Sequence, residues 1–268
     1  MKINKKNFKK LYFDCLRDIL KAQPITNVFK EKISKHDISY IDYDLENYLK
    51  KSWYRAWQVY KLLPDISANK IRILDVGGFL GNFAVCFHRL GYEVVIVDVY
   101  ESYDDSFGTL KEFLISERIE VLDQDFTHSS QEKINQTFDV VICLAVLEHL
   151  ADSPKVLMDN LKHFLTDSGY LILEVPNLLY WPKRINMLIS RSILPSIEVI
   201  YKSSIPFMGH HHEYTTGEIV ELARLAGLKV SHLVHYNYSI DNLRGYLIYL
   251  PILICNNCKE IILIRLIK

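Results

Sequence analysis

The chain has 268 residues, enough for one large α/β domain or for a core with an appended part. Its 32 basic and 32 acidic side chains balance, and no basic stripe accompanies a site, which argues against nucleic acid as a partner. The longest uncharged run, 245–258, is too short for a transmembrane helix. Five scattered cysteines form no disulfide framework, and with no signal peptide they favour a cytoplasmic protein.

Two helical stretches open the chain. Residues 5–22 carry apolar side chains at helical spacing with lysines between them, and Pro24 ends the pattern. We expect this basic helix to pack on its own domain, and the alternative is peripheral contact with an anionic membrane. Residues 42–63 form a second helical stretch that is rich in Tyr and Trp. We expect residues 1–69 to form a helical cap whose aromatic rings wall a substrate pocket.

From residue 71 onward, strand patterns alternate with helix patterns. The predicted strands are 71–76, 93–98, 119–122, 138–144, 170–175, 228–235 and 260–266, and the predicted helices are 81–90, 106–117, 153–165, 215–227 and 240–254. This alternation predicts an α/β fold with helices on both faces of a mainly parallel sheet. Residues 176–213 interrupt it with four prolines. We expect this insertion to form a lid or substrate loop at the carboxyl end of a strand.

A glycine loop follows the first of these strands, within residues 71–84. Its three glycines let the backbone come close to a ligand, and they are Gly77, Gly78 and Gly81. Asp75 lies at the carboxyl end of the strand, where ligands collect in open α/β sheets. Asp98 ends the next strand, at the spacing of an acid that holds an adenosine ribose. Asp125 follows the third strand, where it can receive an adenine amino group.

Both nicotinamide dinucleotides and S-adenosylmethionine contain adenosine, so these acids leave both ligands open. A dinucleotide-binding loop has the pattern Gly-x-Gly-x-x-Gly, whereas here Asp75 stands two residues before Gly77. A carboxylate at that point repels a pyrophosphate and attracts the ammonium and sulfonium groups of S-adenosylmethionine. The charge therefore favours the methyl donor. An NAD-dependent oxidoreductase is the alternative enzyme, and a non-catalytic module that binds S-adenosylmethionine is the alternative of another class.

Three segments resemble the class I S-adenosylmethionine-dependent methyltransferases. Residues 75–81, Asp-Val-Gly-Gly-Phe-Leu-Gly, resemble their motif I, with Phe79 in place of the usual middle glycine. Residues 138–150 resemble the motif after strand 4, which ends in Glu-His-Leu. Residues 210–228 resemble the His-x-x-x-Tyr-Thr segment and the helix before strand 6. The resemblance implies a Rossmann-like sheet of seven strands in the order 3-2-1-4-5-7-6, with strand 7 antiparallel.

The resemblance also implies a domain and a cofactor site. Residues 70–268 form the methyltransferase domain, with the 176–213 insertion over the active site. The implied cofactor is S-adenosyl-L-methionine. The residues assigned to it are Asp75, Gly77 and Gly81 at the methionine part, with Gly78 in the same loop, Asp98 at the ribose with the neighbouring Val99, Asp125 and Phe126 at the adenine, and Leu144 beneath the cofactor.

Methyl transfer is an in-line displacement in which the protein positions the acceptor and takes its proton. Histidine has a suitable pKa for that step. His149 follows strand 4 and His210 comes from the insertion, so we expect them to act as base or to position the acceptor. The alternatives are helix packing for His149 and loop hydrogen bonding for His210. We expect oxygen methylation of a small-molecule or sugar-like acceptor.

No metal site is predicted from the sequence. Neighbouring residues rarely converge on one ion, so the three adjacent histidines at 210–212 do not indicate one. Cys255 and Cys258 lack the second half of a zinc site.

Overall fold

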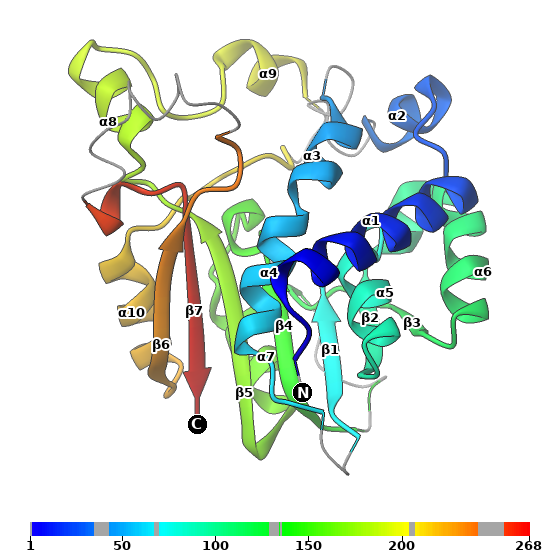
Figure 1. The fold of residues 1–268 in the computed structure, drawn as a ribbon. Helices are drawn as coiled ribbons and strands as arrows, with labels where there is room; N and C mark the ends of the chain where they lie inside the picture. Colours follow the sequence, from blue (N-terminus) through cyan, green and yellow to red (C-terminus); the bar gives the residue numbers. More distant parts are fainter. Residues whose placement is uncertain are drawn as a thin grey trace.

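Seven strands form one sheet in the computed structural model, which describes residues 2–34, 43–66, 70–128, 134, 136–203, 207–240 and 255–268, with only the backbone at 104 and 105 (Figure 1). The strands are β1 (Arg72–Val76), β2 (Glu93–Asp98), β3 (Glu120–Asp123), β4 (Phe138–Leu144), β5 (Leu165–Pro176), β6 (Lys229–Tyr236) and β7 (Ile261–Ile267). Their order is β3-β2-β1-β4-β5-β7-β6. Strands β1 to β5 pair in parallel, and β7 runs antiparallel to β5 and β6. The predicted strand order and the antiparallel seventh strand are confirmed.

Helices cover both faces of the sheet. The described α-helices are α1 (Lys5–Ala22), α2 (Asn27–Ser34), α3 (Leu45–Lys51), α4 (Trp53–Leu62), α5 (Asn82–Arg89), α6 (Gly108–Ser116), α7 (Lys155–His163), α8 (Trp181–Leu188), α9 (Ile197–Lys202) and α10 (Thr216–Leu225). Successive strand side chains point to opposite faces, so neighbours in sequence enter different cores. Ile96 and Ile142 join the core under α1, α4 and α5. Val97 and Cys143 join the core under α7 and α10.

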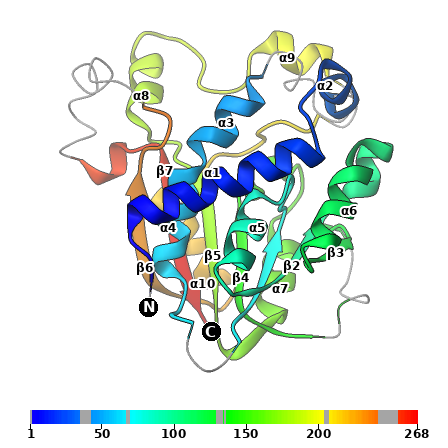
Figure 2. The same cartoon turned by 45° about the vertical axis from the view of Figure 1, so that its right-hand side comes forward.

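The N-terminal helix α1 crosses in front of α4 and α5 in both views (Figures 1 and 2). The centre of its apolar side is buried, including Phe8 and Tyr12, and the flanking Leu11 and Leu20 are partly buried against the same core. The Tyr12 hydroxyl donates to the Leu49 carbonyl at 2.7 Å and accepts from Asn82 at 3.0 Å. The apolar side that a membrane-bound amphipathic helix inserts into lipid is therefore part of the protein core.

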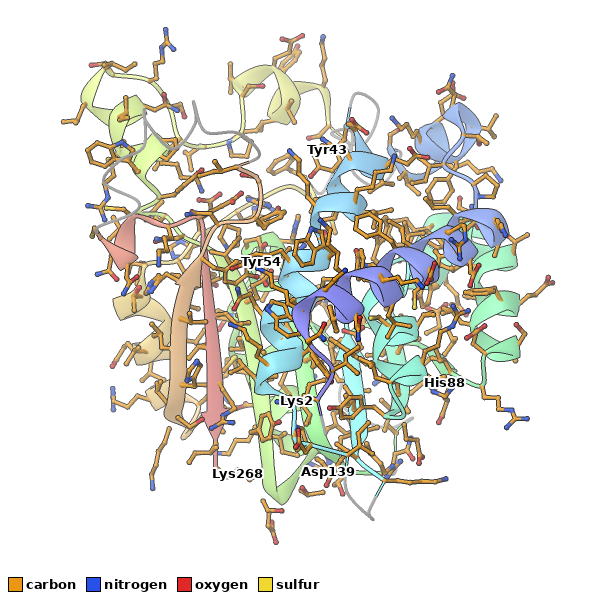
Figure 3. The ribbon with its side chains drawn as sticks, viewed as in Figure 1. Lys2, Tyr43, Tyr54, His88, Asp139 and Lys268 are labelled. Atoms are coloured by element: carbon orange, nitrogen blue, oxygen red, sulfur yellow. The ribbon has the colours of Figure 1, made fainter. Side chains whose placement is uncertain are left out.

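Side chains of α4 connect α1 with the far strands of the sheet. Tyr54, labelled in Figure 3, lies under the ammonium of Lys5 and packs edge-on against the ring of Tyr236 on β6. Arg55 forms a buried ion pair with Glu174 on β5, and its Nε lies 2.7 Å from the carboxylate. The predicted cap thus shares a core with the sheet, and its division from the rest at residue 69 stays a prediction.

Two predicted segments differ in detail from the structure. The predicted helix at 42–63 consists of two helices, α3 and α4, which meet at Ser52. The insertion at 176–213 contains α8 and α9, which lie with α3 beyond the carboxyl ends of the parallel strands (Figure 1). The helix predicted at 240–254 lies outside the described residues, apart from its first residue.

The five cysteines are free thiols in the structure, as the sequence predicts. None of the helices in the described part of the chain combines the length and hydropathy that a bilayer crossing requires.

Candidate functional site

A pocket of about 730 Å³ opens at the carboxyl ends of β1, β2 and β4. This volume lies within the range of sites for small ligands and cofactors. Six of the nine residues predicted to hold the cofactor line it, and these are Gly77, Asp98, Val99, Asp125, Phe126 and Leu144. Both predicted catalytic histidines, His149 and His210, line it too. The N-terminal helices and the insertion complete the wall with Tyr43, Tyr48, Arg55, Pro195, Val199, Phe207 and Met208.

Of the three loop glycines only Gly77 lines the pocket, together with Phe79 from the same loop, whereas Asp75, Gly78 and Gly81 are not among the lining residues. Gly77 has a left-handed backbone with φ +73°, and a Cβ there would lie 2.4 Å from a methyl of Val146. A Cβ on Gly78 would lie equally close to Ile96 inside the sheet. The glycines therefore let the loop pack tightly on β2 and on the turn after β4.

Phe79, in the position of the usual middle glycine, also has a left-handed backbone, with φ +47°. The Asp98 carboxylate accepts its N–H at 2.7 Å, and the Tyr100 hydroxyl donates to its carbonyl at 2.9 Å. Its ring packs against the rings of Tyr103 and Phe107. These contacts stabilise Phe79 in a backbone conformation that favours glycine. The ring of Phe79 forms part of the pocket wall.

The three predicted cofactor-binding acids differ in the pKa of their carboxyl groups. Burial raises the pKa of Asp75 to about 7, and the charge of Asp98 adds to that effect. Burial also raises the pKa of Asp98, against the hydrogen bonds from Phe79 and Val99. Burial raises the pKa of Asp125 too, but its hydrogen bonds to Thr127 and His128 outweigh that effect and leave the pKa lowered. Asp98 and Asp125 thus present acceptor oxygens to the pocket, while the same carboxylates accept the backbone N–H groups of Phe79 and Val99 and of Thr127, respectively.

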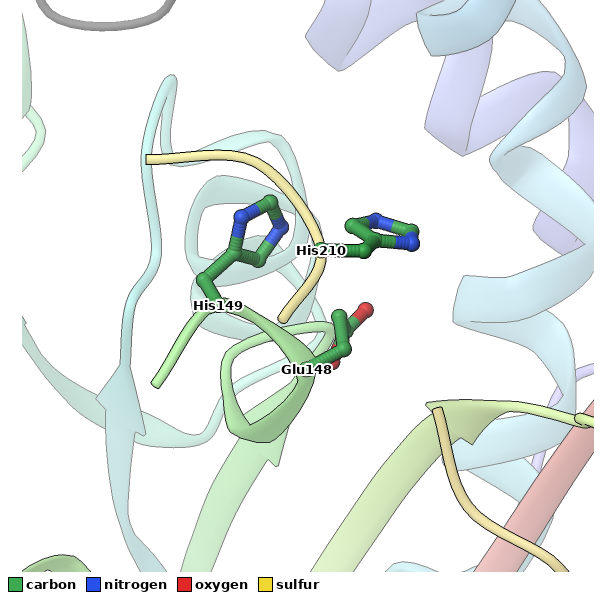
Figure 4. A group of neighbouring side chains, drawn as sticks. All are labelled: Glu148, His149 and His210. Atoms are coloured by element: carbon green, nitrogen blue, oxygen red, sulfur yellow. The ribbon is translucent and has the colours of Figure 1, made fainter. Parts of the chain in front are cut away.

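The turn after β4 carries the second group of polar residues. Ala145 turns the chain with φ +56°, and the 3-10 helix Leu147–His149 follows. The insertion returns against this turn, where the N–H of His211 donates to the Glu148 carbonyl at 2.7 Å. His149 Nδ1 bonds the Met208 carbonyl at 2.8 Å. These contacts bring His149 and His210 together with ring centroids 4.8 Å apart (Figure 4).

Glu148 is a pocket residue that the predicted catalytic pair does not include. Its side chain is only 1% exposed, and among the described residues its Oε2 has no hydrogen-bonding partner. Burial raises the pKa of Glu148 to about 7, partly opposed by the charge of His210. The Glu-His-Leu motif marks the position, but its spacing does not reveal that both neighbouring side chains reach one pocket.

His210 is held by residues of its own segment and of α8. Its Nδ1 lies 3.1 Å from Glu213, which also pairs with Lys183. Burial lowers the pKa of His210, but the hydrogen bond to Glu213 and the charge of Glu148 outweigh it, so the net pKa is raised. The other two adjacent histidines have different partners, since His211 bonds the Phe207 carbonyl and His212 pairs with Glu218.

Comparisons with known proteins agree with this architecture. Residues 47–233 match the model of a family described as "Methyltransferase domain". Over 124 residues the chain is 32% identical to a ubiquinone biosynthesis O-methyltransferase of Rickettsia conorii, a match that covers 44% of this chain and 38% of that protein. The chain thus matches well under half the length of this curated relative.

Two solved structures share the fold. One is an S-adenosylmethionine-dependent methyltransferase from Mesorhizobium loti, with a TM-score of 0.56 and 12% identity over 81% of this chain and 98% of that one. The other is a 1,6-didemethyltoxoflavin-N1-methyltransferase of Burkholderia thailandensis, whose crystals contain its substrate and S-adenosylhomocysteine. Its TM-score is 0.53, with 14% identity over 83% of this chain and 80% of that one.

Proposed function

The chain belongs to the methyltransferase domain family, and we propose that it methylates an oxygen atom of a small-molecule acceptor. S-adenosylmethionine is the methyl donor, as in methyltransferases of the same fold. One observation carries the proposal. A single pocket joins the acids that follow β2 and β3 with the Glu148, His149 and His210 group at the end of β4. Because β1 lies between β2 and β4, the glycine loop stands between these two groups.

The residues present fit the cofactor. Gly77 lacks the Cβ that would crowd the loop against Val146, and Asp98 offers a carboxylate at the pocket wall. We assign the ribose hydroxyls to Asp98 with Val99 beside it, because charge-assisted hydrogen bonds to a carboxylate are strong. Asp125 receives the adenine amino group, and Phe126 and Leu144 pack on the base. Asp75, Gly78 and Gly81 shape the loop at the methionine part from behind the pocket wall.

When bound, the cofactor supplies a methyl group on a positively charged sulfur. The protein has to place an acceptor oxygen in line with that group and to remove its proton. We propose that His149 and His210 act on the acceptor hydroxyl, because both line the pocket at the turn after β4. The turn and the insertion fix their rings through Met208 and Glu213.

The aromatic lining favours an acceptor with a ring. Its rings come from the N-terminal region, the glycine loop, the insertion and the segments after β2 and β6, and they include Tyr43, Tyr48, Phe79, Tyr103, Phe207 and Tyr238. Stacked or edge-on aromatic contacts select a planar ligand. The name of the Rickettsia relative, an O-methyltransferase of ubiquinone biosynthesis, supports a phenolic oxygen over a sugar hydroxyl as the methylated atom.

The test is methyl transfer from labelled S-adenosylmethionine to two acceptor panels, one of substituted catechols and phenols and one of free and nucleotide-linked sugars. We expect turnover in the first panel, with the new methyl group located on oxygen by NMR. Transfer to nitrogen only, or to sugars only, contradicts the proposed acceptor. Saturable binding of the donor without transfer to either panel supports the non-catalytic alternative.

A further inference from the structure

We propose that Glu148, His149 and His210 bind one divalent transition-metal cation in the pocket. Each residue offers one ligand atom, and the three atoms lie within 4.8 Å of one another. Figure 4 shows the carboxylate and the two imidazole rings grouped at the turn after β4. The group includes residues 61 positions apart in the chain, which the contacts of the insertion with this turn bring together.

The hydrogen bonds of both histidines orient them as metal ligands. The acceptor for His149 Nδ1 is the carbonyl of Met208, and for His210 Nδ1 it is the carboxylate of Glu213. Neither acceptor carries a proton to donate, so each Nδ1 is the donor, and a neutral ring then has its lone pair on Nε2. Metal-binding histidines usually donate their other N–H to a carbonyl or carboxylate in this way. The Lys183 ammonium in turn holds Glu213.

The charge of the site also calls for a cation. Glu148 is almost completely buried, and its Oε2 has no hydrogen-bonding partner in the described part of the chain. A buried carboxylate without compensation is costly. The charges of His210 and Arg55 act on it, but His210 is itself one of the proposed ligands and Arg55 is paired with Glu174. A bound cation would compensate the carboxylate directly.

The ligand set selects the kind of ion. Two imidazoles with one carboxylate suit zinc, iron, cobalt or nickel, whereas magnesium and calcium prefer oxygen ligands. Such ions bind nitrogen and oxygen at about 2.0–2.2 Å, so two ligands of one ion are at most about 4.4 Å apart. The three side chains therefore need to close by a few tenths of an ångström or more. Three protein ligands leave positions open toward the pocket.

The site refines how the two histidines act, and this part rests on the proposed function. An acceptor hydroxyl that binds the cation through oxygen loses its proton more easily, as metal-bound water does. The proton passes to water, the oxygen lone pair forms the new O–C bond, and the electron pair of the broken C–S bond stays on sulfur. The histidines then act on the acceptor through the cation.

Metal binding is measured on the full chain after treatment with a chelator and its removal. We expect Co²⁺ to bind with one equivalent per chain and to produce a visible absorption band, and calorimetry with Zn²⁺ to give the same stoichiometry. Glu148→Gln and His210→Ala should weaken binding by at least about 100-fold, and Glu213→Gln by about 10-fold, because Glu213 only orients a ligand. His212→Ala, in the same segment but paired with Glu218, is the control and should bind as the parent does.

The absence of stoichiometric binding overturns the proposal, and so does binding that Glu148→Gln leaves unchanged or that His212→Ala removes. Circular dichroism of each variant checks that it folds. Failure of the metal site is distinct from failure of the proposed function. Methyl transfer at the parent rate in excess chelator leaves the methyltransferase standing and excludes the cation. Stoichiometric metal binding without any methyl transfer leaves the metal site standing and contradicts the proposed methyltransferase activity.

Discussion

Asp98 connects the glycine loop with the pocket through a single carboxylate. One oxygen accepts the N–H of Phe79 and the other accepts the N–H of Val99, so the same group shapes the loop and faces the proposed ribose. The spacing of the acid after the loop is visible in the sequence. The sequence does not show that Asp98 also holds Phe79 in a left-handed backbone conformation. A residue with a side chain adopts that conformation only with supporting contacts, which here come from the end of β2.

We predict that Asp98→Ala weakens S-adenosylmethionine binding by about 1–3 kcal/mol, the value of lost charge-assisted hydrogen bonds. Isothermal titration calorimetry measures it. Glu93→Ala, at the exposed start of the same strand, is the matched control and should bind as the parent does. Equal affinity of Asp98→Ala and the parent would place the ribose elsewhere.

The histidine pair gives a prediction that separates chemistry from cofactor binding. His149→Ala and His210→Ala should each lower kcat by about 10²–10⁴-fold, because each removes a group that acts on the acceptor proton. The dissociation constant of the cofactor should change little, since its proposed contacts come from β1, β2, β3 and β4. Steady-state kinetics and calorimetry check both, with His212→Ala as control. Parent rates in both variants would exclude the pair from catalysis.

Asp75 makes the stability of the ligand-free protein depend on pH. Its pKa is raised from 3.8 to about 7 by burial, so between these values the folded state holds a proton that the unfolded state has lost. Stability from this group is therefore complete below pH 3.8 and is lost as the pH rises to about 7, by at most about 1.4 kcal/mol per pH unit. Above that range its contribution is constant.

Asp75→Asn removes this titration, so we predict that its stability relative to the parent increases from pH 5 to pH 7 and then levels off. Urea unfolding at pH 5, 6, 7 and 8 measures the difference. A difference that is constant over this range would show that Asp75 is ionised in the folded state throughout.

At the scale of elements, α4 and β5 are joined by the buried pair of Arg55 and Glu174. Tyr48 accepts a hydrogen bond from the guanidinium, and the Tyr236 hydroxyl donates to the carboxylate. The helical stretch and the strand can each be predicted from their periodicity, but this pairing cannot. It depends on how α4 lies across the sheet, and the two residues are 119 positions apart.

We predict that Arg55→Met lowers the free energy of unfolding by about 3–5 kcal/mol, because it leaves the carboxylate of Glu174 buried without its partner. The double variant Arg55→Met with Glu174→Gln should recover part of that loss. Urea unfolding of the two single variants and the double variant forms the cycle. A loss below about 1 kcal/mol in Arg55→Met would mean that water or another group compensates Glu174.

The helices within the insertion could not be predicted from the sequence. Four prolines between 176 and 213 indicate an irregular segment over the active site, and the segment does line the pocket. The helices α8 and α9 within it are short and have no fully buried residue, so the hydrophobic pattern that identifies the other helices is weak there. The approach of His210 to Glu148 depends on backbone hydrogen bonds, which carry no side-chain signal.

At the scale of the whole molecule, the alternation of strands and helices and the resemblance of three segments were enough to predict the sheet and its order. Buried strands and amphipathic helices leave a strong periodic pattern, and the antiparallel β7 followed from the resemblance. The sequence did not show that α1 and α4 share one core with the sheet, because their buried side chains have the same spacing in a separate cap. The acceptor end of the pocket was predicted least well, since it is built from three distant segments.

The central claim is that this pocket binds a methyl donor and not a dinucleotide. The most direct measurement is calorimetric titration of the full chain with S-adenosylmethionine and, separately, with NAD. We predict saturable binding of S-adenosylmethionine with one equivalent per chain and no heat of binding with NAD. Saturable heat with NAD and none with S-adenosylmethionine would contradict the account.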